Sequence, residues 1–254
     1  PIFSPMQKNH HAGLTISQPL LIEKLLNWGK QFDHFALYSG NDYPDPYHQY
    51  DLIFASDATE IIALKNDPFE SLYTAWENEK DWLFGFLSYD LKNHVEELES
   101  KNVDGIQAPD LFFFKPKIVG YLVEGVLTIE SIVEDATEVW QDILDTSPLL
   151  RNELPELHFN SRITREEYVD DVHALQRHIQ QGNIYEINYC QEFFAEQADI
   201  DPFTVFQALN QKAHPPFAGF LNTPHQAVIS ASPERYLQKN GSRLISQPIK
   251  GTAK

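Results

Sequence analysis

The sequence predicts a protein of short strands and helices whose strands pair in an antiparallel fashion. Short apolar runs recur between Phe35 and Ile132 with only brief polar breaks between them. Strands spaced this closely form hairpins, because a parallel neighbour requires a crossover of about a dozen residues or more. A few other segments combine helical periodicity with capping residues at their ends, as surface helices do.

The first part of the chain is predicted to mix short helices with strands. One helix begins near Gln18, has Pro19 in its first turn and is followed by Gly29, positions where these residue types are tolerated. The run 82–87 is apolar on both faces, which predicts a central strand. The remaining predictions are strands at 35–38, 111–114, 118–122 and 127–132, a hairpin of 52–55 with 61–64, and a helix at 134–144.

A polar segment at 145–160, with Pro148 and Pro155, is predicted to link two regions, residues 1–150 and 151–254. After it, Thr164 and Glu167 have the spacing of a capping box, and Gly182 suits the left-handed end of a helix. The further predictions are strands at 184–194, 217–221 and 227–231, a helix at 202–209, and a hairpin of 236–238 with 244–247 across Asn240 and Gly241.

The charge of the chain excludes two classes of main partner. With 37 acidic and 19 basic residues the formal net charge is −18, so nucleic acid and anionic membranes would be repelled. A locally positive pocket for an anionic small molecule is still compatible with this charge. No apolar run approaches the length of a membrane span.

The start of the chain and its cysteine content bear on location. The first five residues lack the basic-then-apolar pattern of a signal peptide, and a chain that starts at Pro1 has lost its initiator Met or been excerpted. Cys190 is the single cysteine, so no intramolecular disulfide can form. We expect Cys190 to be a buried small hydrophobe and the protein to be cytoplasmic.

Two charged residues near the end of the chain are candidates for chemistry. Lys250 lies between Ile249 and Gly251, and an amine near apolar walls can have a lowered pKa and act as a nucleophile. Glu234 follows a predicted strand and could donate a proton if its pKa were raised. On local evidence alone, both are more simply explained as solvated surface charges. Asn188, inside the predicted strand 184–194, either bonds across the sheet or faces a ligand.

Five motifs follow one another in the second half of the chain: Thr164 to Tyr168, Gly182 to Asn188, Pro216 to Phe220, Ser232 to Arg235 and Pro248 to Thr252. In this order they resemble the chorismate-utilising enzyme family, and within it the amino-terminal portion of the aminodeoxychorismate (para-aminobenzoate) synthase branch. The first half matches more loosely, at Ser39-Gly40, Pro46 to Asp51 and Gly85 to Asp90. The resemblance implies an α+β fold like that of anthranilate synthase component I, with antiparallel sheets packed face to face and flanking helices.

The resemblance also implies roles for individual residues. Aminodeoxychorismate synthases carry Lys at the position of Lys250, where anthranilate synthases carry Ala. Lys250 is therefore expected to attack C2 of chorismate, and Glu234 to protonate the departing C4 hydroxyl. Ammonia from a glutamine amidotransferase partner then adds at C4 and gives 4-amino-4-deoxychorismate, in folate biosynthesis. Asn188 and Thr252 are expected to bind the substrate.

Part of the family's machinery is expected outside this chain. Mg²⁺ is held in the family by glutamates further along, so no metal ligand is expected here, and the truncated chain alone should not complete the reaction. The resemblance places a tryptophan site at Ser39, Tyr47, His48, Gln49, Tyr50, Pro216, Phe217 and Ala218. Gln49 stands where a relative has Arg, and an ordinary domain interface is the alternative there. Two other functions stay open: anthranilate synthase, and a non-enzymatic amino-acid-binding or interaction domain.

Overall fold

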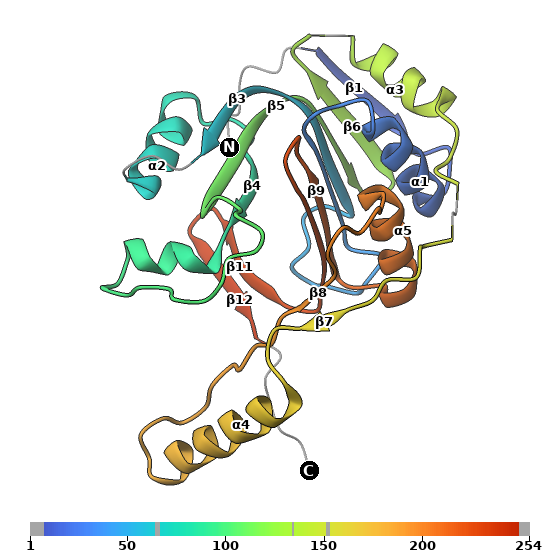
Figure 1. The fold of residues 1–254 in the computed structure, drawn as a ribbon. Coiled ribbons are helices and arrows are strands. Elements are labelled where there is room, and N and C mark those ends of the chain that lie inside the picture. The colour runs from blue at the N-terminus through green and yellow to red at the C-terminus, as the bar shows by residue number, and fades with distance from the viewer. Residues whose placement is uncertain (1–7, 64–66, 134, 151–152, 249–254) are drawn as a thin grey trace. The chain divides into compact units, whose positions relative to one another are not determined.

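The computed structural model describes residues 8–63, 67–133, 135–150 and 153–248 (Figure 1). The chain forms two compact units, one made of residues up to 152 together with those from 202 onward, and a smaller one made of residues 153–201. The boundary at 150/151 between the two predicted regions of the chain stays a prediction. In the structure residues from 202 onward pack with the first part of the chain.

An eight-stranded antiparallel sheet is the frame of the larger unit. Its strands follow the order β1-β6-β5-β3-β2-β9-β10, and β4 pairs with β5 beside this path. All of the pairings are antiparallel, which confirms the prediction from strand spacing. The strands are β1 (Lys8–Gly13), β2 (Phe35–Ser39), β3 (Leu52–Ala63), β4 (Phe84–Leu87), β5 (Leu111–Val123), β6 (Val126–Ser131), β9 (Phe217–Asn222) and β10 (Ala227–Ser232).

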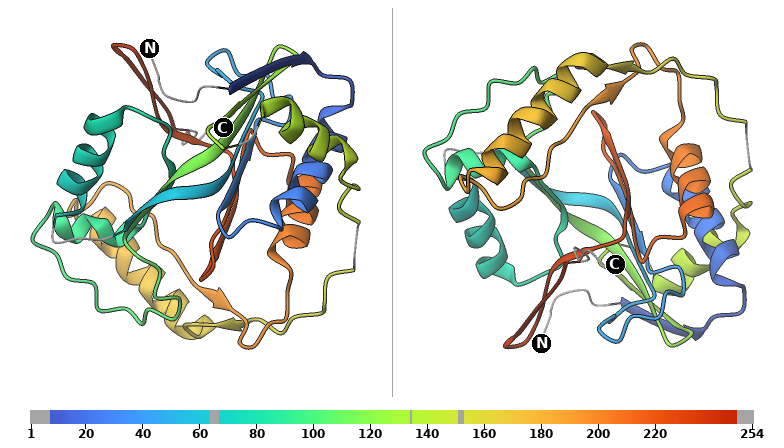
Figure 2. Two further views of the ribbon diagram at one scale, coloured as in Figure 1. Left: turned by 90° about the horizontal axis from the view of Figure 1, so that it is seen from above. Right: turned by 90° about the horizontal axis from the view of Figure 1, so that it is seen from below.

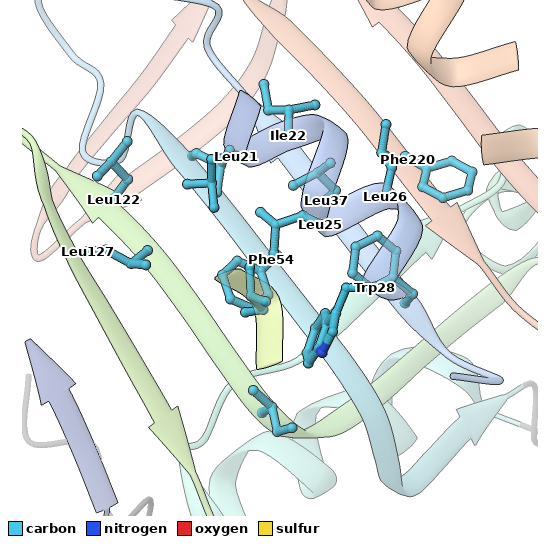
Figure 3. Close-up of a cluster of buried hydrophobic side chains, with 14 of the residues drawn as sticks. Leu21, Ile22, Leu25, Leu26, Trp28, Leu37, Phe54, Leu122, Leu127 and Phe220 are labelled. Carbon is cyan, nitrogen blue, oxygen red and sulfur yellow. The ribbon is translucent and has the colours of Figure 1, made fainter. Parts of the chain in front are cut away.

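Three helices cover one face of this sheet: α1 (Gln18–Gly29), α3 (Ala136–Asp145) and α5 (Pro202–Ala213) (Figures 1 and 2). Leu21, Leu25 and Leu26 of α1 are fully buried in the core beneath it, and each contributes about 1.5–3 kcal/mol by leaving water. Figure 3 shows the side chains of α1 gathered over Phe54 of β3. Trp28 packs edge-on against Phe54, with ring centroids 5.8 Å apart.

The opposite face of the sheet carries aromatic side chains. Tyr38 of β2 and Phe84 of β4 stack with ring centroids 6.2 Å apart, and Trp82 stacks on Phe84 at 5.9 Å. Burial raises the pKa of Tyr38 to about 12. The remaining elements of the larger unit are helix α2 (Pro68–Glu79), the short 3-10 helix η1 (Tyr89–His94), and the hairpin of β11 (Arg235–Asn240) with β12 (Arg243–Gln247).

Three predictions within the sheet are wrong. Residues 52–63 form one strand, β3, in place of a hairpin. Its register shifts between Ala58 and Glu60, just after Asp57, which takes a left-handed φ of 57°. The predicted break between 111–114 and 118–122 is likewise absent, since β5 continues through Pro116. This proline lies opposite Ala58, next to the register shift. A missing backbone N–H is tolerated at a bulge. β4 pairs with β5 alone, so it is not a central strand.

The smaller unit holds helix α4 (Arg165–Gln180) and the two-residue strands β7 (Asn160–Ser161) and β8 (Phe193–Phe194). The predicted capping box is confirmed: Thr164 Oγ1 accepts from the Glu167 amide at 3.2 Å, and the Thr164 amide donates to Glu167 Oε2 at 2.8 Å. Gly182 is left-handed as predicted, with a φ of 76°.

The long strand predicted at 184–194 is wrong. Within it, strand geometry is confined to Phe193 and Phe194, which pair with β7. β7 is two residues long, so it cannot offer a ladder to a longer partner. Asn188 therefore lies outside any strand and is exposed, and Cys190 is exposed where burial was expected.

Candidate functional site: a pocket at the end of the sheet

A pocket of about 550 Å³ lies in the larger unit where β2 ends and β9 begins. Its walls come from four segments: residues 38–53, the start of β9 with Pro216 before it, Ser230 of β10, and residues 234–238. This volume falls in the range of small-molecule sites. Distant parts of the sequence build it, because the β2–β9 pairing places Ser39 opposite Ala218.

A folded turn after β2 forms one wall. The Gly40 amide donates to the Asp51 carbonyl at 3.0 Å, and the Asn41 amide donates to the Ser39 hydroxyl at 3.2 Å. Asn41 and Asp42 take left-handed φ angles of 50° and 55°. Non-glycine residues adopt this region at a cost, which the surrounding hydrogen bonds must offset. The turn is therefore held in one shape.

A nearly buried ion pair joins three of the segments. The guanidinium of Arg235 on β11 binds the Asp45 carboxylate, and the two side chains are 11% and 9% exposed. The same guanidinium donates to Gln247 Oε1 on β12 and lies 4.8 Å from the centre of the Phe217 ring. Burial raises the pKa of Asp45, but the hydrogen bond from Arg235, the Tyr47 amide and the positive charge outweigh it and leave the pKa below its ordinary value.

Glu234 lines the same pocket and is half-buried. It follows β10 in a small turn, in which the Ser232 hydroxyl accepts from the Glu234 amide at 3.2 Å and donates to the Glu234 carbonyl at 3.0 Å. The predicted proton donor thus has a defined backbone position at the end of a strand.

The pocket is rich in acceptors. Asp42, Asp45, Asp51 and Glu234 line it, whereas Arg235 is the single Arg or Lys among the described lining residues and is engaged by Asp45. Gln238 adds a buried side-chain oxygen with no hydrogen-bond partner in the described part of the chain, while its nitrogen donates to the Tyr47 carbonyl at 3.0 Å. The ammonium group of a ligand would therefore find charged and neutral acceptors here.

The structure brings together most of the residues predicted for a tryptophan site. Those that line the pocket are Ser39, His48, Gln49, Tyr50, Pro216, Phe217 and Ala218. Tyr47 does not line it and contributes its carbonyl to Gln238 instead. Asn188 belongs to the smaller unit. Lys250 and Thr252 lie outside the described residues.

Sequence reasoning missed Asp45 as a functional residue. It lies 190 positions from its partner Arg235, so no local pattern connects them. Tyr43 was also missed, since it reaches the pocket through the turn after β2. Asp51 ends the loosely matching motif Pro46 to Asp51 but was given no role. The signal that was present is the cluster of turn residues in 40–46, which indicates a loop at the end of a strand.

The described residues give no metal centre and no membrane helix. Within ranges 8–63, 67–133, 135–150 and 153–248, no group of three or more His, Cys, Asp or Glu is arranged to hold a metal ion. Among those same residues, no helix is both long and apolar enough to cross a bilayer.

Comparison with known proteins identifies the class. The family model of chorismate binding enzymes matches residues 30–254, and the chain belongs to that family. It is 29% identical over 171 residues to aminodeoxychorismate synthase component 1 of Escherichia coli (strain K12), an alignment that covers 66% of this chain and 37% of that protein. It is 25% identical over 201 residues to anthranilate synthase component 1 of Thermus thermophilus, covering 72% of this chain and 43% of that protein.

The fold agrees with a solved structure. The chain is similar to the crystal structure of anthranilate synthase component I from Streptococcus pneumoniae TIGR4, with a TM-score of 0.67, 17% sequence identity, and coverage of 80% of this chain and 54% of that one. This confirms the predicted α+β class with antiparallel sheets. The chain thus spans about half the length of that structure, and less than half of the two relatives above.

Proposed function

We propose that this chain is the amino-terminal part of an aminodeoxychorismate synthase component I. The reaction is the amination of chorismate to 4-amino-4-deoxychorismate, with ammonia from a glutamine amidotransferase partner, on the route to para-aminobenzoate and folate. The observation that carries the proposal is Lys250 in a chain of the chorismate binding family. Relatives of both activities match the chain, so this residue, more than overall similarity, favours amination at C4.

Lys250 and Glu234 divide the chemistry between them in this proposal. The lysine amine attacks C2, the ring double bonds shift, and the C4 hydroxyl leaves as water with a proton from Glu234. Ammonia then attacks C4, the double bonds shift back, and the lysine departs from C2 as a free amine. Hydroxide is a poor leaving group, which is why a proton donor is needed. A covalent amine splits one difficult displacement into two easier ones.

The proposal assigns the remaining machinery elsewhere. Mg²⁺ would supply charge to hold the substrate carboxylate, and its ligands are expected beyond this chain. Asn188 and Thr252 are proposed to bind chorismate. We expect the 254-residue chain by itself to make no product. The cytoplasmic location stays a prediction.

The test is a chain that continues into the carboxy-terminal half of an aminodeoxychorismate synthase component 1, assayed with chorismate and ammonium. We expect aminodeoxychorismate, identified by mass and distinguished from fluorescent anthranilate. Glu234→Gln should lower the rate by about 10²-fold or more, and Lys250→Ala should lower it sharply. Lys239→Ala, on exposed β11, serves as the matched control. A Lys250→Ala rate within about twofold of the parent would rule out the covalent role.

A second proposal concerns the pocket itself: that it binds the amino acid tryptophan. Supporting this are the predicted residues that line it and the acceptors that suit an ammonium group. Against tight binding, Gln49 replaces an Arg of a relative, and Arg235 is already paired with Asp45. Calorimetry of the chain with tryptophan and with chorismate separates this from a domain interface, which would bind neither.

A further inference from the structure

A second pocket, of about 400 Å³, lies between the start of α1 and the end of α5. Its residues play no part in the proposed amination. Gln18 and Glu23 of α1 contribute one side, Gln207 and Asn210 of α5 another, and Asn41 of the turn after β2 a third. The two helices are linked here by a hydrogen bond from Gln211 Nε2 to Glu23 Oε1 at 3.4 Å.

Carbonyl groups of the backbone determine how the side-chain amides of this pocket are oriented. Gln207 Nε2 donates to the Leu149 carbonyl at 3.1 Å, Asn41 Nδ2 to the Pro215 carbonyl at 2.8 Å, and Gln18 Nε2 to the Asp51 carbonyl at 3.4 Å. A carbonyl can only accept, so the nitrogen of each amide must face the chain. The oxygens of Gln18 and Gln207 then face away from these bonds. Neither oxygen has a hydrogen-bond partner in the described part of the chain.

The other amides of the pocket are also committed as donors. Asn41 and Asn210 form a reciprocal pair, with nitrogen-to-oxygen distances of 2.7 and 3.1 Å. Gln211 donates to Glu23. Each of the amides of Gln207, Asn210 and Gln211 uses one of its two N–H groups in these bonds, so a ligand meets oxygen acceptors together with a few remaining N–H donors.

The charged residues of the pocket also favour a cationic ligand. Glu23 and Asp42 contribute carboxylates, and no Lys or Arg is among the residues described around it. His214 is the one imidazole there. An anion would meet two carboxylates and no Lys or Arg among the described lining residues, whereas a cation with several N–H groups would satisfy both the charges and the amide oxygens.

The volume and the lining residues of the pocket further limit the class of ligand that fits it. A volume of about 400 Å³ is far larger than one metal ion needs and lies within the small-molecule range. Pro19 and Ile22 supply an apolar wall that suits a short alkyl chain. Asn41, Asp42 and His214 have left-handed φ angles of 50°, 55° and 42°, and Asn41 is held by its bonds to Asn210 and Pro215. This wall of the pocket is thus built into the fold.

We propose that this second pocket binds a small organic cation, an alkylammonium or alkylguanidinium, through the carboxylates of Glu23 and Asp42 and the amide oxygens of Gln18 and Gln207. The alkyl part lies against Pro19 and Ile22. This site is separate from the proposed tryptophan pocket, with which it shares Asp42 as a common wall residue.

The test uses the full 254-residue chain and 1,4-diaminobutane as the probe. Succinate, with opposite charge, and 1,4-butanediol, with none, are the matched ligands. Saturable binding of the diamine is expected by calorimetry, together with shifts of the side-chain NH₂ resonances of Asn41, Gln207 and Asn210 in ¹⁵N NMR spectra. Equal binding of succinate or butanediol would overturn the proposal, as would shifts confined to Gly219 and Ser230 of the first pocket.

Glu23→Gln keeps the shape of the side chain and removes its charge. It should weaken the diamine by about tenfold or more, the loss of one hydrogen bond to a charged group. Glu138→Gln, on the exposed first turn of α3, should leave the affinity unchanged. If Glu23→Gln fails to fold by circular dichroism, Asp42→Asn supplies the same comparison. A loss below twofold in the folded variant would exclude the assigned role of these carboxylates.

Discussion

Removal of the Asp45 charge is the sharpest test of how the first pocket is held together. Asp45→Asn leaves Arg235 nearly buried without its anionic partner, while its contacts with Gln247 and Phe217 remain. Breaking a buried pair at one partner costs about 3–5 kcal/mol. Because this pair borders an open pocket, water can reach the guanidinium, and we expect a loss at the lower end, about 3 kcal/mol.

The loss is measured by thermal unfolding of the chain at pH 7. For a protein of this size it corresponds to a fall in Tm of about 6–12 °C. Asp57→Asn is the matched control, because the Lys117–Asp57 pair is more exposed to solvent, with side chains 31% and 41% accessible, and has an N–O distance of 2.8 Å. An exposed pair contributes about 1 kcal/mol at most.

The pH dependence of the same pair has a definite sign. The pKa of Asp45 is lowered from 3.8 in the folded state, so its contribution is present above the unfolded value and is lost as the pH falls through the folded one. The difference between the parent and Asp45→Asn should therefore shrink below about pH 3.8. If Asp45→Asn costs no more than Asp57→Asn at pH 7, the pair does not hold the pocket together.

Two further predictions concern the core. A Cβ on Gly120 would lie 2.1 Å from the Phe54 ring, so Gly120→Ala should destabilise the chain by about 1–3 kcal/mol or more in denaturant unfolding. Gly219→Ala is the milder control, because its Cβ would be 3.4 Å from Tyr38. Equal losses in the free energy of unfolding for the two variants would show that the Phe54 ring moves aside. Tyr38 has a pKa raised by burial to about 12 in the folded chain, so stability should fall as the pH rises from 10 towards 12. Tyr38→Phe should flatten that decline in alkaline melting curves, and an unchanged slope would assign it to other groups.

Elements that depend on neighbouring residues were predictable from the sequence. The capping box of Thr164 and Glu167 works over one helical turn, and the β11–β12 hairpin depends on a short turn in which Gly241 takes a φ of 58°. Predictions failed where pairing partners decided the outcome. Residues 52–63 are one strand because β5 runs alongside them, and 184–194 is largely irregular because β7 offers two residues.

The same distinction between local and long-range features applies to the candidate site. The motif order from Thr164 to Thr252 was enough to predict the family and to nominate Glu234 and Lys250. The tertiary structure alone placed Asp45 against Arg235, since the turn after β2 meets a hairpin far away in the chain. It also gave the physical reason why Ser39 and Ala218 lie together, which is the β2–β9 pairing. It alone also revealed the acceptor-lined pocket between α1 and α5. Motifs record the chemistry that residues can perform, whereas long-range pairing and packing decide which of them meet.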